Sequence, residues 1–232
     1  MEDLKLRKTI TILGGVKRSG KTRFALKWAN YLAKDKKVLF LSWSSFSERL
    51  IYILEEMGET ISKNLLIETN YDVFDIKAFS EIDNRLSRDS FDIIFFDDLH
   101  LSSFDQFEAF PYEESFKILT PLLFLANEFN VKIILVSDLS VFHQSDGSDN
   151  MYDIIQYFQR IYNNRWPKKL MQHTCQILFL FRPYLHNYKT DKNGCSTQNI
   201  VELHDIRNNS IESTFRFDNL NEKIFSSYQK EN

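Results

Sequence analysis

The stretch that decides the fold is Gly15-Val16-Lys17-Arg18-Ser19-Gly20-Lys21-Thr22, which fits the phosphate-binding pattern G-x-x-x-x-G-K-[ST]. A β-branched run at 9–13 precedes it, and residues 23–33 follow with apolar side chains at helical spacing. A strand before the loop and a helix after it are the context that the pattern needs. We therefore interpret this stretch as a phosphate-binding loop; the alternative is a glycine-rich turn that binds nothing.

The residue types in this loop suit a nucleoside triphosphate. Glycines let the backbone wrap an anion, which the amide groups and the positive end of the following helix dipole then hold. Lys21 would supply a mobile charge for the β- and γ-phosphates, and the Thr22 hydroxyl is a ligand for Mg²⁺. We expect ATP to be bound by Gly15, Val16, Lys17, Arg18, Ser19, Gly20, Lys21 and Thr22, with Mg²⁺ as cofactor.

Composition places the chain among globular proteins. It has 232 residues, 43% hydrophobic and 26% charged, with a net charge of −3 that argues against a strongly basic nucleic-acid-binding protein. No apolar run is long enough to cross a membrane, and the first residues lack a secretory pattern. Cys175 and Cys195 are too few for a disulfide framework, so we expect free thiols, no structural zinc and a cytoplasmic location.

Strand-like runs alternate with helical patterns, which predicts an α/β fold with a mostly parallel sheet flanked by helices. The expected strands lie at 9–13, 37–43, 91–98 and 131–137, and the expected helices at 23–33, 48–57, 73–86 and 113–129. Residues 61–70 are ambiguous, and 151–162 have a partly helical pattern. Three late runs, 174–181, 199–206 and 213–217, are expected strands with antiparallel members. A single domain spans 1–232, with a flexible tail at 226–232.

The run Ile93-Ile94-Phe95-Phe96-Asp97-Asp98 has the form of a Walker B strand, with apolar residues that end in acids. In P-loop proteins an acid at this place helps to hold Mg²⁺. We expect Asp97 to serve the metal together with Thr22, and Asp98 to orient water or act as the base. The alternative is a buried strand that ends in a solvated acidic turn.

Five segments in sequence order resemble the ATPase domain of DnaB-type replicative helicases. They are Ser42–Leu50 (family S-L-E-M-P-S-E-Q-L), Asp97–Leu101 (D-Y-L-Q-L), Leu125–Leu139 (L-A-K-E-L-N-V and A-L-S-Q-L), Phe179–Arg182 (F-I-Y-R) and Ile206–Asn209 (Q-R-N-G). Their order and spacing hold from about Thr9 to Phe225. The resemblance implies a RecA-like P-loop ATPase core, without the amino-terminal helical domain of the helicases.

Set against this family, several residues around the γ-phosphate differ. The acid that polarises the attacking water is Ser44 here, and a serine without an activating partner is no general base near neutral pH. The family's γ-phosphate-sensing glutamine is Asp138, and the lysine near the late arginine is Asp205. The resemblance makes Arg207 a candidate arginine finger for a neighbouring subunit's nucleotide; a surface arginine at a strand end is the alternative. We expect ATP to be bound while hydrolysis is weakened, or is rebuilt around Asp98.

A nucleic-acid-binding segment is also suggested by the resemblance, because the helicases grip single-stranded DNA with loops after the S-Q-L strand. Basic and aromatic side chains that can pair with phosphates and stack on bases occur here at Arg160, Arg165, Trp166, Lys168 and Lys169. A solvated basic turn is the alternative. The acidic stretch 142–149 weakens the DNA interpretation.

Two functions of different classes remain open. The first is a DnaB-like, DNA-dependent ATPase that works as a homo-oligomer, which the order of the motifs and Arg207 favour. The second is a regulatory or interaction protein that binds ATP without translocating on DNA, which the net charge, the missing helical domain and the altered γ-phosphate residues favour. A third class, a small-molecule kinase, would need an acceptor pocket that the sequence does not identify.

Overall fold

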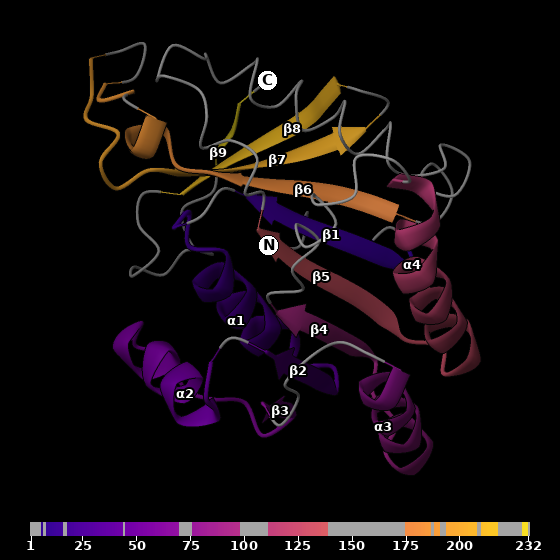
Figure 1. Cartoon of the computed structure of the whole chain (residues 1–232). Helices are drawn as coiled ribbons and strands as arrows, with labels where there is room; N and C mark the ends of the chain where they lie inside the picture. Colours follow the sequence, from indigo (N-terminus) through magenta and orange to yellow (C-terminus); the bar gives the residue numbers. More distant parts are fainter. Residues whose placement is uncertain are drawn as a thin grey trace.

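The computed structural model describes residues 6, 8–15, 18–43, 45–69, 76–97, 111–138, 175–186, 188–190, 194–207, 210–217 and 229–231. The elements, in chain order, are β1 (Ile10–Gly15), α1 (Lys21–Leu32), β2 (Val38–Ser42), α2 (Ser47–Glu56), β3 (Leu65–Glu68), α3 (Ile76–Arg88), β4 (Ile93–Asp97), α4 (Pro111–Glu128), β5 (Lys132–Asp138), β6 (Cys175–Phe181), the 3-10 helix η3 (Pro183–His186), β7 (Val201–Arg207), β8 (Ser210–Phe217) and β9 (Gln229–Glu231). Figure 1 shows them arranged around one sheet.

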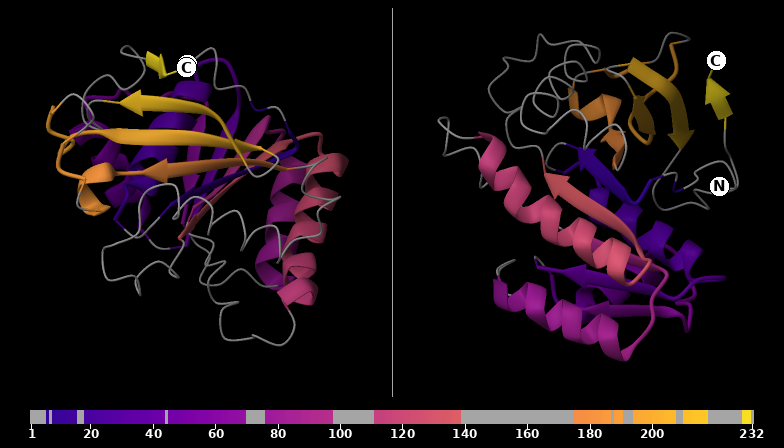
Figure 2. Two further views of the ribbon diagram at one scale, coloured as in Figure 1. Left: turned by 90° about the horizontal axis from the view of Figure 1, so that it is seen from above. Right: turned by 90° about the vertical axis from the view of Figure 1, so that its right-hand side faces the viewer.

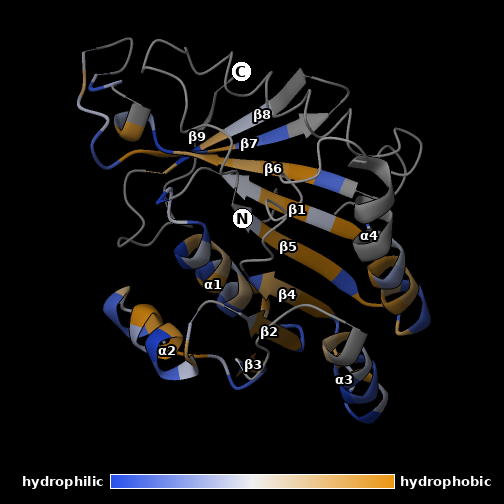
Figure 3. Cartoon of the chain, viewed as in Figure 1, coloured by the Kyte–Doolittle hydropathy of each residue, from blue (hydrophilic) through white to orange (hydrophobic). Residues whose placement is uncertain are grey.

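The described strands form a single nine-stranded sheet in the order β3-β2-β4-β5-β1-β6-β7-β8-β9. From β3 to β6 every pairing is parallel. The residues of β1, β2 and β4 are all buried, because parallel strands covered on both faces read as continuous apolar runs. Figure 3 shows this apolar band through the middle of the sheet. The carboxyl ends of these parallel strands therefore share one edge, to which β1 brings Gly15.

Helices cover both faces of the sheet, as Figure 2 shows from two sides. One apolar core lies between the sheet and helices α1 and α2, with Phe24, Trp28 and Leu54 among its buried members. The second lies under α3 and α4 and includes Ile82 and Leu125. Burial of large side chains such as these contributes roughly 1.5–3 kcal/mol each. The α/β fold class predicted from the sequence is confirmed.

The last part of the sheet is antiparallel. β6 pairs antiparallel with β7, β7 with β8, and β8 with β9, which confirms the predicted late antiparallel strands. A register shift between Asp205 and Ile206 interrupts the β7–β8 pairing. Inside the stretch expected to be a tail, Gln229–Glu231 form β9.

Local departures from the predicted elements have simple causes. The ambiguous stretch 61–70 contains β3, a four-residue strand at the edge of the sheet, too short for periodicity to identify. Helix α2 ends before Gly58, whose φ of +69° suits the left-handed turn that closes a helix. The predicted helical stretch 151–162 lies outside the described residues.

Candidate functional site

Strand β1 leads into the predicted loop at a position that only glycine can occupy. A Cβ atom on Gly15 would lie 2.7 Å from the carbonyl oxygen of Leu180 on β6 and 2.8 Å from Oγ of Ser19. Such contacts cannot form without shifting backbone. The chain then turns through left-handed conformations at Arg18, with φ of +67°, and Gly20, with φ of +92°. Val16 and Lys17 lie outside the described residues, so only part of the predicted loop is described.

Helix α1 starts at the end of this loop with its amide groups available to a ligand. Within the described residues no side chain caps the helix, and its first turn contains no acid. Its first intrahelical bond runs from the N–H of Phe24 to the carbonyl of Gly20, at 2.9 Å. Uncapped first-turn amides and the helix dipole favour an anion at this end. Lys21 is nearly buried, and its Cδ lies 3.3 Å from the Cβ position of Gly15, so its aliphatic stem folds back over the loop.

Asp97 lies at the carboxyl end of β4 and is fully buried. The hydroxyl of Thr22, in the first turn of α1, donates a 3.0 Å hydrogen bond to Oδ1 of Asp97. The hydroxyl of Ser42, at the end of β2, donates a 3.2 Å bond to Oδ2. The structure thus brings together the two residues predicted to serve a metal, and adds Ser42, which sequence reasoning had not singled out.

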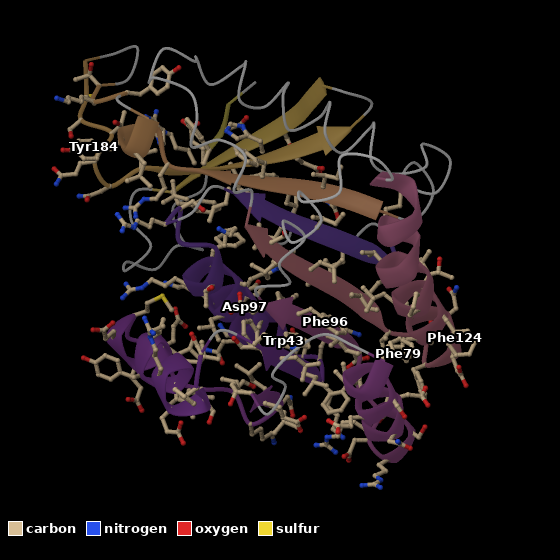
Figure 4. All side chains as sticks on the ribbon, viewed as in Figure 1. Trp43, Phe79, Phe96, Asp97, Phe124 and Tyr184 are labelled. Atoms are coloured by element: carbon tan, nitrogen blue, oxygen red, sulfur yellow. The ribbon has the colours of Figure 1, made fainter. Side chains whose placement is uncertain are left out.

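Aromatic side chains support Asp97 from the opposite face of the sheet. Trp43 follows Ser42 and stacks on Phe96, with ring centroids 5.8 Å apart and planes 12° from parallel. The N–H of Trp43 donates a 3.4 Å bond to the carbonyl of Asp97. Figure 4 shows the three labelled side chains together at the ends of β2 and β4. These contacts fix the ends of both strands relative to each other.

Arg182, which follows β6, adds a positive charge near the same edge. Its strand neighbour Leu180 pairs with Gly15. Burial, together with the like charge of Arg23, lowers the pKa of the Arg182 guanidinium. Arg23 itself pairs with Glu56 of α2 at 3.0 Å, whereas Arg182 has no carboxylate partner within the described part of the chain. A half-buried cation of this kind is a candidate for contact with an anionic ligand.

The donor set at Thr22 and Asp97 fits a magnesium ion better than a transition metal. In the described residues no cluster of three or more His, Cys, Asp or Glu side chains could hold a metal by itself. Magnesium is usually held by one or two carboxylates together with phosphate oxygens and water. One buried carboxylate bonded to a helix-start hydroxyl therefore fits a Mg²⁺ that arrives with a polyphosphate.

The remaining predicted site residues are described only in part. Asp138 ends β5, and its backbone pairs with Gly15, so it lies at the loop edge; its side chain lies outside the described residues. Ser44, Asp98 and the proposed DNA-binding residues Arg160, Arg165, Trp166, Lys168 and Lys169 also lie outside them. Their roles stay predictions.

The main chain of Arg207 lies at the other edge of the sheet from the phosphate loop. Leu203 of β7 is level with Gly15, because both pair with Leu180. Arg207 is four residues further along β7, about 13 Å at 3.3 Å per residue. Figure 1 shows β7 running opposite to β1, toward that far edge.

Asp205, two residues before Arg207, is buried within the sheet. The side-chain amide of Gln176 on β6 donates a 3.3 Å bond to its Oδ2. Both side chains are at most 6% exposed, so this acid belongs to the interior of the described domain.

Two further sequence predictions concern the surface. Cys195 is an exposed free thiol, as expected; the side chain of Cys175 lies outside the described residues. No helix in the described part of the chain has the length and apolar character needed to span a membrane.

Comparison with known proteins bears on the fold. No protein-family model matches the sequence, and neither does any curated protein. The ATPase domain of a DnaB-like helicase superposes with a TM-score of 0.61 and 17% identity, over 96% of this chain and 84% of that one. A DnaB-like replicative helicase, solved with attention to its interactions with primase, gives 0.60 and 18%, over 93% of this chain and 57% of that one. The resemblance predicted from the sequence is thus confirmed for the fold: the chain has the RecA-like α/β fold of the ATPase domains of DnaB-like helicases.

Proposed function

We propose that this chain is a helicase-like domain that binds Mg-ATP and hydrolyses it weakly. The observation that carries the proposal is the bond between Thr22 and Asp97, which joins the start of α1 to the end of β4. It sits beside a loop in which Gly15 has no room for a Cβ. A hydroxyl and a carboxylate at the start of an uncapped helix are what a metal-bound triphosphate requires.

The nucleotide's phosphates would lie against the loop from Gly15 to Thr22. The amide groups at the start of α1 would donate to them, and Lys21, which starts that helix, would neutralise charge on the β- and γ-phosphates. Thr22 and Asp97 would hold Mg²⁺, which supplies charge neutralisation to the phosphates. Arg182, half-buried beside Arg23, would gain an anionic partner.

Weak hydrolysis follows from the residues around the γ-phosphate. Ser44 stands where related helicases carry the acid that polarises water, and it cannot take a proton near neutral pH without help. Asp138 ends the strand next to Gly15, so its charge would be close to the polyphosphate. Like charges at about 4 Å cost about 4 kcal/mol at an effective dielectric constant of 20. Asp98 is the remaining candidate base.

We further propose that Arg207 acts on a nucleotide held by another copy of the chain. The register of β7 takes Arg207 toward the edge opposite to the loop of its own subunit, so a contact within one subunit is disfavoured. An arginine presented between subunits would stabilise charge in the transition state. This supports a homo-oligomer with ATP between subunits.

Single-stranded DNA is the proposed effector if the chain works as a helicase-like ATPase, through Arg160, Arg165, Trp166, Lys168 and Lys169. The second candidate function, a regulator that binds ATP without translocating, is favoured by the net charge of −3 and by Ser44. ATP turnover measured with and without single-stranded DNA, together with the native mass, separates the two. DNA-stimulated turnover by an oligomer supports the first function. A monomer that binds ATP and ignores DNA supports the second.

A further inference from the structure

Ser42 and Asp97 face each other across neighbouring strands. They are register partners at the carboxyl ends of β2 and β4, and both side chains are fully buried. The Ser42 hydroxyl donates to Oδ2 of Asp97 at 3.2 Å, while Thr22 donates to Oδ1 at 3.0 Å. The two oxygens of the carboxylate therefore each receive a hydroxyl hydrogen bond, from a different element.

A buried carboxylate needs such donors, because an unsatisfied charged oxygen in a dry site is costly. Two donors on different oxygens also fix the plane of the carboxylate. We propose that Ser42 is a positioning residue for the metal site: its bond to Oδ2 keeps Oδ1 turned toward Thr22 and the start of α1. This inference rests on the proposed binding of Mg-ATP, and names a residue that the phosphate-loop pattern does not contain.

The same bond links the metal-binding acid to the segment that follows β2. Ser42 is directly followed by Trp43, whose N–H donates to the carbonyl of Asp97 and whose ring stacks on Phe96. Ser44, at the position of the catalytic acid in related helicases, comes next. Loss of the Ser42 hydroxyl should therefore change how strongly Mg²⁺ assists nucleotide binding, more than it changes binding of the metal-free nucleotide.

The test compares the affinity for a fluorescent ATP analogue with Mg²⁺ and with EDTA. Ser42→Ala should lower the gain in affinity that Mg²⁺ provides by about tenfold, as expected for one hydrogen bond to a charged group. Ser42→Thr keeps the hydroxyl and should restore the gain. The matched control is Thr11→Val in β1, which removes a buried hydroxyl that has no hydrogen-bond partner in the described residues. This control should leave the gain unchanged.

The outcomes are distinct. An unchanged magnesium gain in Ser42→Ala, or an equal loss of affinity with Mg²⁺ and with EDTA, overturns the inference and reduces Ser42 to a structural role. If Ser42→Ala does not fold, Ser42→Cys takes its place, because a thiol fills the site but donates weakly. A wild-type chain that binds no nucleotide contradicts the proposed function itself, whereas one that binds but ignores the Ser42 variants contradicts this inference alone.

Discussion

The hydroxyl of Thr22 donates a 3.0 Å hydrogen bond to Oδ1 of Asp97, across 75 residues of sequence. Thr22 belongs to a sequence pattern, whereas Asp97 is an acid that ends an apolar run. The fold places them together because α1 follows β1, and β4 reaches the same edge of the parallel sheet. This contact turns two separate sequence predictions into one site that can be tested by mutation.

Gly15→Ala tests the close approach of backbone at the loop. We expect the variant to lose most ATP binding, because its Cβ would lie within 2.8 Å of Leu180 and Ser19 and would displace the loop. Isothermal titration with ATP checks this. The control is Gly58→Ala, where no atom lies within 4 Å but φ is +69°. It should cost about 1 kcal/mol of stability through backbone strain and leave ATP affinity intact; equal affinity losses in both would argue against a specific loop effect.

Trp43 should report the arrival of the ligand. It contacts Asp97 through its backbone and Phe96 through its ring, so Mg-ATP should change its fluorescence. The Trp43→Phe variant should lose this signal while still binding ATP. Trp28, fully buried against Phe95 under α1, provides the control, because Trp28→Phe should keep the signal. A signal that survives in Trp43→Phe would place the responding residue elsewhere.

Ser44→Glu should restore a general base and raise ATP turnover. General bases contribute about 10²- to 10⁴-fold, so we expect at least a tenfold increase in kcat, measured by phosphate release. Ser44→Gln has the same size without the charge and should give no increase. Brisk turnover by the wild-type chain, abolished by Asp98→Asn, would instead show that Asp98 has taken over and that hydrolysis is not weakened.

Arg207→Ala should lower turnover without lowering ATP affinity, because the arginine is proposed to serve a neighbouring subunit. Mixing Arg207→Ala subunits with Lys21→Ala subunits should recover part of the lost turnover, since the second variant can lend its Arg207 to the intact loop of the first. Phosphate release by the mixture, relative to each variant alone, measures this. A mixture no more active than its components would contradict action between subunits.

Sequence reasoning predicted the strand–loop–helix unit well, because the pattern from Gly15 to Thr22 specifies both its residues and its flanks. It also identified Asp97, since an acid that ends an apolar run is a recognisable signal. It could not identify Ser42, because that role depends on the register of β2 against β4, which joins residues 55 apart. The signal available was the serine at the end of one buried strand and the acid at the end of another.

Other parts of the molecule depended on tertiary context. Strand β3 was ambiguous because its four residues carry too little periodicity, and its pairing with β2 decides its conformation. The position of Arg207 at the far edge follows from antiparallel pairing of β7 with β6, which no local pattern specifies. Asp205, noted in the sequence only as a departure from the helicases, lies buried against Gln176.

The measurement that tests the central claim most directly is an equilibrium titration of the chain with a fluorescent ATP analogue in Mg²⁺. The account predicts saturable binding by the wild type, weakened by EDTA. Lys21→Ala should lose most of that affinity, whereas Lys34→Ala, an exposed lysine beyond the far end of α1, should keep it. No binding by the wild type, or equal affinity in the wild type and Lys21→Ala, would contradict the account.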